Sequence, residues 1–278
     1  MRALLLCAAL LATGCGSSRT ASERSAATTS TPGPSTHSVA VDGTTREYRL
    51  YRPAGLSRRA PLIVVYHGWP QTAEDAERGG GWTQAADRHG FVVAFPEGVE
   101  QSFNAGGCCG GAQSEGVDDV AAAHAIITDV SRRVGVDRRR IYATGFSNGA
   151  MMAYRLGCES DRFAAIGPVA GTQMVDCPDR RRVSVIHIHG TEDGIVPPDG
   201  DADLPPIRRV ISQWRSSLRC APASVTTSGD LRRSRSRCPG GLDVDLFTLR
   251  GLDHEWATRS QGLDTTETLW AFFARHRR

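Results

Sequence analysis

The chain has 278 residues, of which 40% are hydrophobic, and this suffices for one domain with a well-buried core. Its formal net charge is only +3, so charge alone indicates neither a nucleic acid nor a strongly acidic partner. Lys is absent, and the arginine runs at 138–140, 180–182 and 232–237 contain no interleaved aromatic residues, so we predict solvated loop charges there.

The first 15 residues are typical of an export signal. A positive start at residues 1–2 precedes an apolar stretch at 3–12, which is too short to span a bilayer. Small residues then stand directly before Cys15, a pattern that resembles a bacterial lipobox. We therefore predict a lipoprotein signal peptide over 1–15, diacylation of Cys15 and anchoring on the outer face of a bacterial membrane. The alternative is an ordinary cleaved signal that releases a secreted protein.

Residues 16–38 are rich in Ser, Thr, Ala and Pro and contain almost nothing to bury. This composition predicts a flexible tether, followed by one folded domain over 39–278.

Six cysteines fall within that domain, and an even number on an exported chain favours disulfides. Cys220 with Cys238 brackets a single polar loop and is the first candidate pair; Cys158 with Cys177 is the second. The adjacent pair at 108–109 could bond to each other, but we expect separate partners for them. The spacing does not resemble a zinc site.

The domain alternates between strand-like and helix-like segments. Residues 61–66 and 91–95 are continuous apolar runs, which are typical of strands buried on both faces. Strands are predicted at 46–51, 61–66, 91–95, 141–146, 163–169, 183–188 and 242–249, and helices after a cap at Asp118 and at 148–156, 204–218 and 265–275. This alternation predicts an α/β fold with a mostly parallel central sheet and helices on both faces. Ligands bind such sheets at the carboxyl ends of the strands.

The motif G-x-S-x-G occurs at 145–149, between an apolar strand and a helix. Its two glycines permit a sharp strand-to-helix turn that exposes the hydroxyl of Ser147, and the helix N-terminus offers N–H groups to a developing negative charge. We predict that Ser147 is a nucleophile rather than part of an incidental turn.

A serine nucleophile needs a base, and the chain order in α/β-hydrolases is Ser, acid, His. His254 lies after the last predicted strand and before the final helix, as that order requires. Asp193 follows the strand at 183–188 among turn residues and is the predicted acid, with Glu192 and Asp199 as rivals.

His187 and His189 alternate on one predicted strand, which could suggest a metal pair. No third ligand stands at a suitable spacing, so we predict that both make structural hydrogen bonds beside the site and that the protein has no metal.

Acyl transfer also needs donors for the tetrahedral oxyanion. The N–H of Asn148, which follows the nucleophile, is one candidate, and the N–H of Trp69 in the loop after the strand at 61–66 is the other. We assign His67, Trp82, Phe103 and Trp256 to the wall of the substrate pocket.

Several motifs in register resemble the secreted polyhydroxybutyrate depolymerase and feruloyl esterase family, which includes lipoproteins of the LpqC type. They are the segments at 66–69, 104–110, 117–120, 141–156 and 186–197. The resemblance covers nearly the whole domain and implies an α/β-hydrolase fold and a cofactor-free carboxylesterase whose triad is Ser147, Asp193 and His254. One departure is the approach to His254, where Leu252-Asp253 stand in place of the glycine that relatives often carry.

We therefore expect a serine carboxylesterase that hydrolyses feruloyl, acetyl-sugar or short hydroxyalkanoate esters through an acyl-enzyme. Its partners would be a small or oligomeric ester and, through the lipid, a membrane, but no nucleic acid. The alternatives are a polyhydroxybutyrate depolymerase proper and a non-catalytic cell-envelope binding lipoprotein on a hydrolase scaffold.

Overall fold

A computed structural model of the chain describes residues 31–178 and 182–278. The predicted signal peptide, Cys15 and most of the predicted tether lie outside the described residues. The strands are β1 (Gly33–Val41), β2 (Thr44–Arg52), β3 (Ala60–Tyr66), β4 (Val92–Pro96), β5 (Val136–Phe146), β6 (Ala165–Val169), β7 (Ser184–Gly190), β8 (Ser224–Ser228), β9 (Leu231–Cys238) and β10 (Leu242–Leu249). The helices are α1 (Ala73–Arg78), α2 (Trp82–His89), α3 (Gly110–Ser114), α4 (Asp119–Arg133), α5 (Asn148–Glu159), α6 (Ile207–Ser217) and α7 (Thr265–Phe273), with a short 3₁₀ helix, η1, at Arg259–Gln261.

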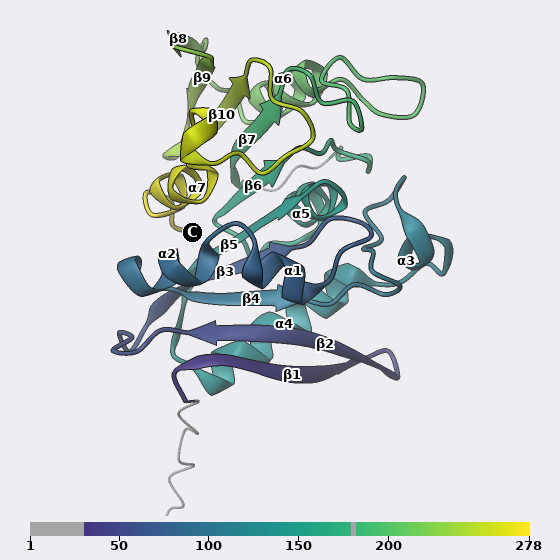
Figure 1. Cartoon of the computed structure of the whole chain (residues 1–278), viewed down its shortest axis with the longest axis vertical. Helices are drawn as coiled ribbons and strands as arrows, with labels where there is room; N and C mark the ends of the chain where they lie inside the picture. Colours follow the sequence, from purple (N-terminus) through teal and green to yellow (C-terminus); the bar gives the residue numbers. More distant parts are fainter. Residues whose placement is uncertain (1–30, 179–181) are drawn as a thin grey trace, which may run out of the picture.

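The strands form one sheet in the order β1-β2-β4-β3-β5-β6-β7-β10-β9-β8. The six strands from β4 to β10 in that order run parallel to one another. The strands on either side are antiparallel: β1 pairs with β2 and β2 with β4 at one edge, and β10 pairs with β9 and β9 with β8 at the other. Figure 1 shows the sheet extending from β1 at the bottom to β8 at the top. The predicted α/β-hydrolase arrangement, a mostly parallel sheet between helices, is confirmed.

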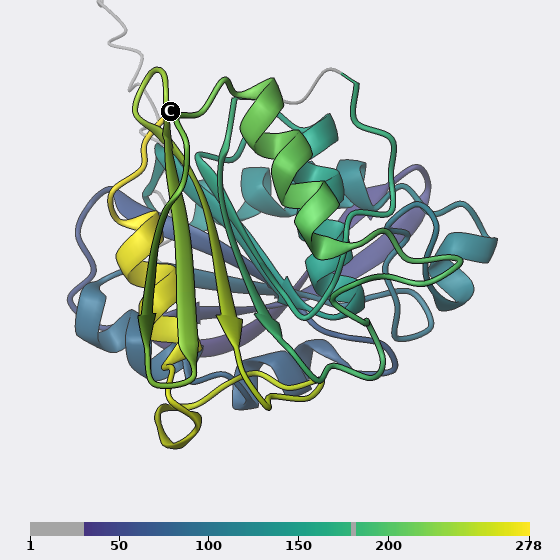
Figure 2. The ribbon, with the colours of Figure 1, turned by 90° about the horizontal axis from the view of Figure 1, so that it is seen from above.

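The apolar central strands build a core on both faces of the sheet. On β3, Leu62 and Val64 face one layer with α4, α5 and α6, while Ile63 and Val65 face the other with α2 and α7. Successive strand residues point to opposite faces, so a continuous apolar run fills both layers at once. Figure 2, seen from above, shows α6 and α7 on opposite sides of the sheet.

Helix α4 begins where the sequence predicts. The carboxylate of Asp118 accepts a hydrogen bond from the N–H of Ala121 at 2.8 Å, which satisfies one of the free N–H groups of the first turn. The apolar residues that follow, including Ile126 and Val130, are fully buried.

The predicted tether is wrong for residues 33–38, because β1 begins at Gly33 and pairs along its whole length with β2. Its side chains alternate between exposed and half-buried, so polar Ser and Thr fit an edge strand that covers little. The tether prediction overlooked this pairing.

The arginine run at 232–237 was predicted as a loop but lies within β9. Ser234 and Ser236 are buried between the arginines, Leu231 is buried before them, and Arg235 lies over the ring of Phe247 at 5.1 Å. Charged side chains near a sheet edge discourage further strand pairing, so such a strand has no apolar signature. The run at 138–140 likewise lies in β5 rather than in a loop.

Disulfides join Cys158 to Cys177 and Cys220 to Cys238, the two pairs proposed from the sequence. Cys108 bonds to Cys109, so the expectation of separate partners for them is wrong; the other four domain cysteines are taken up by the first two bridges.

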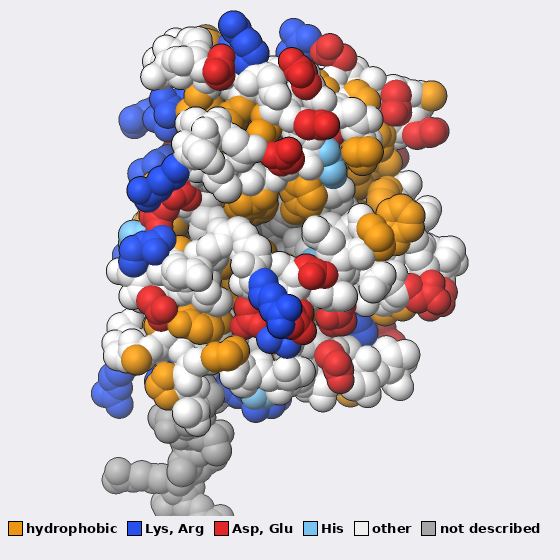
Figure 3. Space-filling model, in the orientation of Figure 1, with side chains coloured by type: hydrophobic (Ala, Val, Ile, Leu, Met, Phe, Trp, Pro, Cys, Tyr) orange, Lys and Arg blue, Asp and Glu red, His pale blue; other side chains and the backbone are white. Residues whose placement is uncertain are grey.

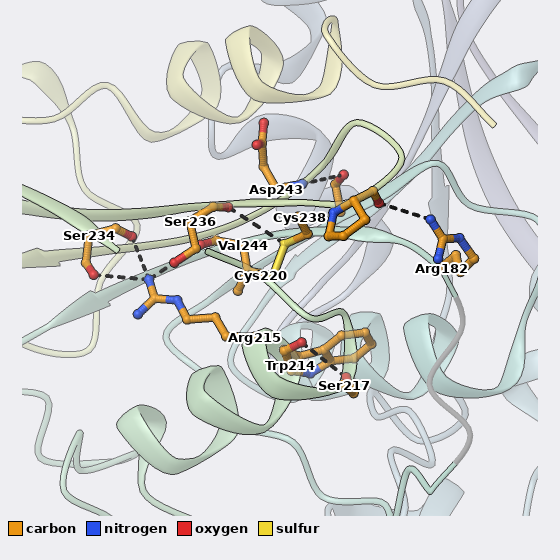
Figure 4. The surroundings of a disulfide bond; sticks show 12 residues. Arg182, Trp214, Arg215, Ser217, Cys220, Ser234, Ser236, Cys238, Asp243 and Val244 are labelled. Carbon is orange, nitrogen blue, oxygen red and sulfur yellow. Dashed lines mark hydrogen bonds between the residues drawn. A yellow bond between two sulfur atoms is a disulfide. The ribbon is translucent and has the colours of Figure 1, made fainter. Parts of the chain in front are cut away.

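The Cys220–Cys238 bridge ties the segment after α6 to the end of β9. Figure 4 shows its surroundings, in which Arg215 of α6 donates hydrogen bonds to the carbonyl and hydroxyl oxygens of Ser234. Covalent and polar links therefore hold the antiparallel edge against α6. Throughout 31–178 and 182–278, no helix is both long and apolar enough to cross a bilayer.

Candidate active site

Ser147 is the single residue between the end of β5 and the start of α5, and its backbone has φ 53° and ψ −117°. A non-glycine residue at positive φ is strained and persists only where its surroundings hold it. The helix presses against β3: a Cβ on Gly149 would lie 2.3 Å from the carbonyl oxygen of Tyr66 and 2.5 Å from that of His67. Gly145 is equally confined by Gly149. The two glycines therefore allow the turn that presents the Ser147 side chain, which is only partly buried.

Asp193 and His254 meet at the carboxyl edge of the sheet, as the topology predicts. The Nδ1 of His254 lies 3.0 Å from Oδ1 and 2.9 Å from Oδ2 of Asp193. Asp193 follows β7 and His254 follows β10, and these strands are parallel neighbours. The carboxylate therefore accepts from Nδ1–H, and Nε2 stays available on the other side of the ring.

The Asp193 carboxylate is fixed by further donors. Its Oδ1 accepts from the N–H groups of Ile195 at 3.0 Å and Val196 at 2.8 Å. Burial raises the pKa of this carboxyl, but hydrogen bonds from His189, His254 and the Val196 N–H outweigh burial and hold the pKa well below its ordinary value. Asp193 therefore remains a carboxylate that can orient His254 and stabilise its charged form.

The loops that carry the acid and the base are hydrogen-bonded to each other. Asp253 Oδ1 accepts from the N–H of His254 at 2.7 Å and from the N–H of Gly194 at 3.1 Å. The N–H of Glu192 also donates to the carbonyl of Leu252 at 3.0 Å. Asp253, which stands where relatives often carry glycine, therefore links the His254 loop to the Asp193 loop through its carboxylate. Its position in the sequence did not indicate this contact.

The His254 ring lies beside the nucleophile turn. Its centroid is 4.7 Å from that of Phe146, the residue before Ser147, and its side chain is 14% exposed. The structure thus gathers all three residues of the predicted triad at one edge of the sheet.

In the loop after β3, the hydrogen bonds of the Gly68 carbonyl fix the direction of the Trp69 N–H. The carbonyl of Gly68 accepts from Nδ1 of His67 at 2.8 Å and from the N–H of Gln71 at 2.9 Å. His67 Nε2 accepts from the N–H of Gly98 at 3.1 Å, which places the ring hydrogen on Nδ1. Because N–H and C=O of a trans peptide point in opposite directions, the Trp69 N–H points away from these partners.

Neither proposed oxyanion donor is otherwise engaged. Within the described parts of the chain, neither the Trp69 N–H nor the Asn148 N–H donates a hydrogen bond. Asn148 is the first residue of α5, where an N–H has no intrahelical acceptor. Its side-chain amide exchanges two hydrogen bonds with the main chain of Phe103, at 2.8 and 2.9 Å, and so holds the preceding loop against α5.

A cavity of about 440 Å³ adjoins His254. His67, Trp82 and Trp256 line it, as expected, and the two indoles meet edge to face with centroids 6.1 Å apart. Phe103 does not line it: this residue is fully buried behind His67, with ring centroids 4.5 Å apart, so its assignment to the pocket wall is wrong. Phe103 lies in the loop between β4 and α3, where the sequence has no periodicity that shows which side chains point inwards.

The cavity continues over Trp256. A second hollow of about 570 Å³ shares Gly80, Trp256 and Thr258 with the first and extends towards η1 and the end of α2. Figure 3 shows hydrophobic side chains around a hollow in the middle of this face. The site therefore has room beyond a small acyl group.

A sequence profile of the family described as Esterase PHB depolymerase matches residues 46–189, which include the G-x-S-x-G turn. The chain belongs to this family.

Relatives named as esterases agree. The chain is 36% identical to the "Putative esterase NocK" of Nocardia uniformis subsp. tsuyamanensis, over 78% of this chain and 72% of that protein. It is 30% identical to Feruloyl esterase B of Piromyces equi, over 76% of this chain but only 43% of that longer protein.

Solved structures show the same fold at low identity. An acetyl xylan esterase from Aspergillus awamori superposes with a TM-score of 0.67 at 14% identity, covering 87% of this chain and 99% of that one. The LpqC poly(3-hydroxybutyrate) depolymerase from Bordetella parapertussis gives 0.58 at 18% identity, over 88% and 95%. Family membership and these relatives make the protein a hydrolase that acts on carboxylic ester bonds.

Proposed function

We propose that the protein cleaves esters by the serine mechanism, with Ser147 as nucleophile, His254 as base and Asp193 as the acid that orients it. The observation that carries this proposal is the Asp193–His254 pair beside the strained turn at Ser147. Ser147 Oγ attacks the ester carbonyl carbon while its proton passes to His254 Nε2. The N–H groups of Trp69 and Asn148 stabilise the resulting oxyanion.

Collapse of the tetrahedral intermediate breaks the bond to the alcohol oxygen, which takes the proton from His254 and leaves. Water then attacks the acyl-enzyme, again giving a proton to His254. The second collapse returns that proton to Ser147 Oγ and releases the carboxylic acid.

The cavity supports an aromatic acyl or alcohol group, such as a feruloyl ester, better than a bare acetyl group. The partly buried indole of Trp256 lines the cavity and packs edge to face on the buried indole of Trp82, so this wall of the cavity is aromatic. Feruloyl esterase B among the relatives supports the same assignment.

We further propose that the mature protein is exported and held at a membrane through lipid on Cys15. The support is the apolar signal and the small residues before Cys15. Metabolic labelling with a palmitate analogue in an expressing bacterium, with Cys15→Ser beside the wild type, tests it. Labelled wild type and unlabelled variant would support the anchor; an unlabelled wild type would contradict it.

Hydrolysis of methyl ferulate, p-nitrophenyl acetate and a hydroxybutyrate trimer by wild type, Ser147→Ala and Ser131→Ala tests the mechanism and the substrate class. Ser131 lies on α4, where its hydroxyl bonds only within the helix, and serves as a matched control. We expect Ser147→Ala to lower kcat by about 10⁴-fold or more and Ser131→Ala to change it little. Equal, near-background rates in all three folded proteins would contradict the proposal and favour a binding function.

A further inference from the structure

A chain of buried side chains lies behind the Asp193 carboxylate. The hydroxyl of Tyr154 on α5 is 2.8 Å from Nδ1 of His187, and Nε2 of His187 is 3.0 Å from Nδ1 of His189. His189 Nε2 is in turn 3.2 Å from Oδ2 of Asp193 and 2.8 Å from the carbonyl oxygen of Val196. The exposed fraction is 3% or less for each of the four side chains from Tyr154 to Asp193.

The partners fix the direction of these hydrogen bonds. His189 Nε2 faces only acceptors, a carboxylate and a carbonyl oxygen, so it carries a hydrogen. With that hydrogen on Nε2, the Nδ1 of His189 is the acceptor, and His187 Nε2 donates to it. Burial lowers the pKa of His187 well below its ordinary value, so His187 is neutral and its Nδ1 accepts from the Tyr154 hydroxyl. Every donor therefore points towards Asp193.

We propose that His189 is a positioning residue for the catalytic acid, and that the chain from Tyr154 through His187 holds it in the tautomer that this role needs. The proposal rests on the proposed serine mechanism. His189 binds the oxygen of Asp193 that no backbone N–H reaches, since Ile195 and Val196 both donate to Oδ1.

The same N–H also fixes the loop. His189 binds the carbonyl of Val196, and the N–H of Val196 binds Asp193, so one imidazole holds both ends of the turn that carries the acid. Without it, the carboxylate keeps its donors on Oδ1 and could rotate away from His254.

Loss of the His189 Nε2–H would also change the electrostatic interaction between Asp193 and His254. A carboxylate with fewer donors is more basic and holds the imidazolium form of His254 more strongly. His254 is then protonated at a higher pH, so the acid limb of the kcat/KM profile moves to higher pH. The titratable groups that face the pair are His187 and His189 on β7, Asp253 and Glu255 in the His254 loop, and His67 and Asp75 across the cavity.

Two substitutions of His189 separate positioning from packing. Leucine fills similar space without a donor, whereas the side-chain amide of glutamine can replace the Nε2–H. We expect His189→Leu to lower kcat by about 10–100-fold and to move the acid limb of kcat/KM to higher pH. His189→Gln should recover most of kcat and return the limb towards the wild-type position.

A matched pair of tyrosine variants tests the far end of the chain. Tyr154→Phe removes the donor to His187, whereas Tyr142→Phe removes an equally buried hydroxyl that bonds the carbonyl of His276. We expect a smaller upward shift of the acid limb in Tyr154→Phe and none in Tyr142→Phe. Equal losses in both His189 variants without a shift, or equal profiles in both tyrosine variants, would overturn the proposal.

Nitrogen-15 NMR of the wild-type imidazoles tests the tautomers without any turnover. We expect both His187 and His189 as neutral Nε2–H forms at pH 7, assigned with the corresponding glutamine variants. An Nδ1–H tautomer or an imidazolium at either position would overturn the chain. Because this measurement needs no substrate, it can support the chain even if ester hydrolysis fails, and it does not depend on the folding of His189→Leu.

Discussion

The turn at Ser147 requires glycine at 145 and 149, because a Cβ at either position would clash with the backbone. Gly149 lies in the first turn of α5, directly against the carbonyl groups that end β3. The conformation of Ser147 is strained, and the packing of the helix on the strand holds it. The proposed role of Ser147 as nucleophile therefore depends on the glycines at 145 and 149 as well as on its own hydroxyl.

We predict that Gly149→Ala lowers both stability and activity. Its Cβ would lie 2.3 Å from the oxygen of Tyr66, a backbone atom that cannot move without shifting β3. Overpacking of this kind costs about 1–3 kcal/mol, which corresponds to a melting temperature roughly 5 °C lower. Thermal unfolding and ester hydrolysis measure the two effects.

Gly194→Ala is the control for that substitution. It lies in the loop of Asp193, yet its Cβ would meet only the Asp253 carboxylate at 3.9 Å, an ordinary contact. A wild-type melting temperature in both variants would contradict the steric account of the turn.

At the scale of the elements, the parallel order of the strands brings the site together. Strands β3, β5, β7 and β10 are contiguous through β6, and each is followed at its carboxyl end by one part of the site. The loop after β3 carries the proposed oxyanion donor, the Trp69 N–H, and the loops after β7 and β10 carry the proposed acid and base. The amino ends of the same strands lie away from the proposed site, and a disulfide near them joins other elements of the fold.

This disulfide joins Cys220 to Cys238. Cys238 pairs with Leu242 at the amino end of β10, at the opposite end of the strand from His254. We predict that the double substitution Cys220→Ser/Cys238→Ser lowers the free energy of unfolding by about 2–4 kcal/mol, because the bridge closes a short loop in the unfolded chain. Denaturant unfolding measures this loss.

The same variant should keep kcat/KM within about twofold of the wild type at 25 °C, since the catalytic loops stay attached to β7 and β10. A large loss of activity in the folded double variant would show that the edge hairpin supports the site.

For the molecule as a whole, buried histidines link stability to pH. Burial lowers the pKa of His67, His187 and His276, and also that of the less buried His37 and His124. The unfolded chain takes up protons near pH 6.5 that the native protein does not bind. The stability contributed by these groups is therefore present above pH 6.5 and lost as the pH falls below it. We predict a melting temperature about 5 °C lower at pH 5 than at pH 7.5.

Asp245 acts in the opposite direction. Burial raises its pKa to about 6, despite the attraction of Arg235, so its contribution is present at low pH and lost as the pH rises through 6. Asp245→Asn removes this opposing term, and we expect its melting temperature to rise at pH 8 and to fall more steeply than that of the wild type between pH 7.5 and 5. Calorimetry at several pH values tests both proteins, and a flat profile in both would contradict the assignment.

The sequence by itself determined the order of the elements and the positions of the candidate catalytic residues. Apolar runs located β3 and β4, a cap located α4, and the G-x-S-x-G turn located Ser147. These features depend on residues that are close in the chain, and local backbone preferences and periodicity report them directly. Their position after consecutive parallel strands also indicated Asp193 and His254.

Only the tertiary structure decided which distant residues meet. It placed Phe103 behind His67, gave Asp253 two backbone donors and joined Tyr154 to Asp193 through two histidines. It also paired β1 and β9 in the sheet, although neither has an apolar run. Sheet pairing and side-chain contact across elements depend on register and packing, which polar local sequence does not encode.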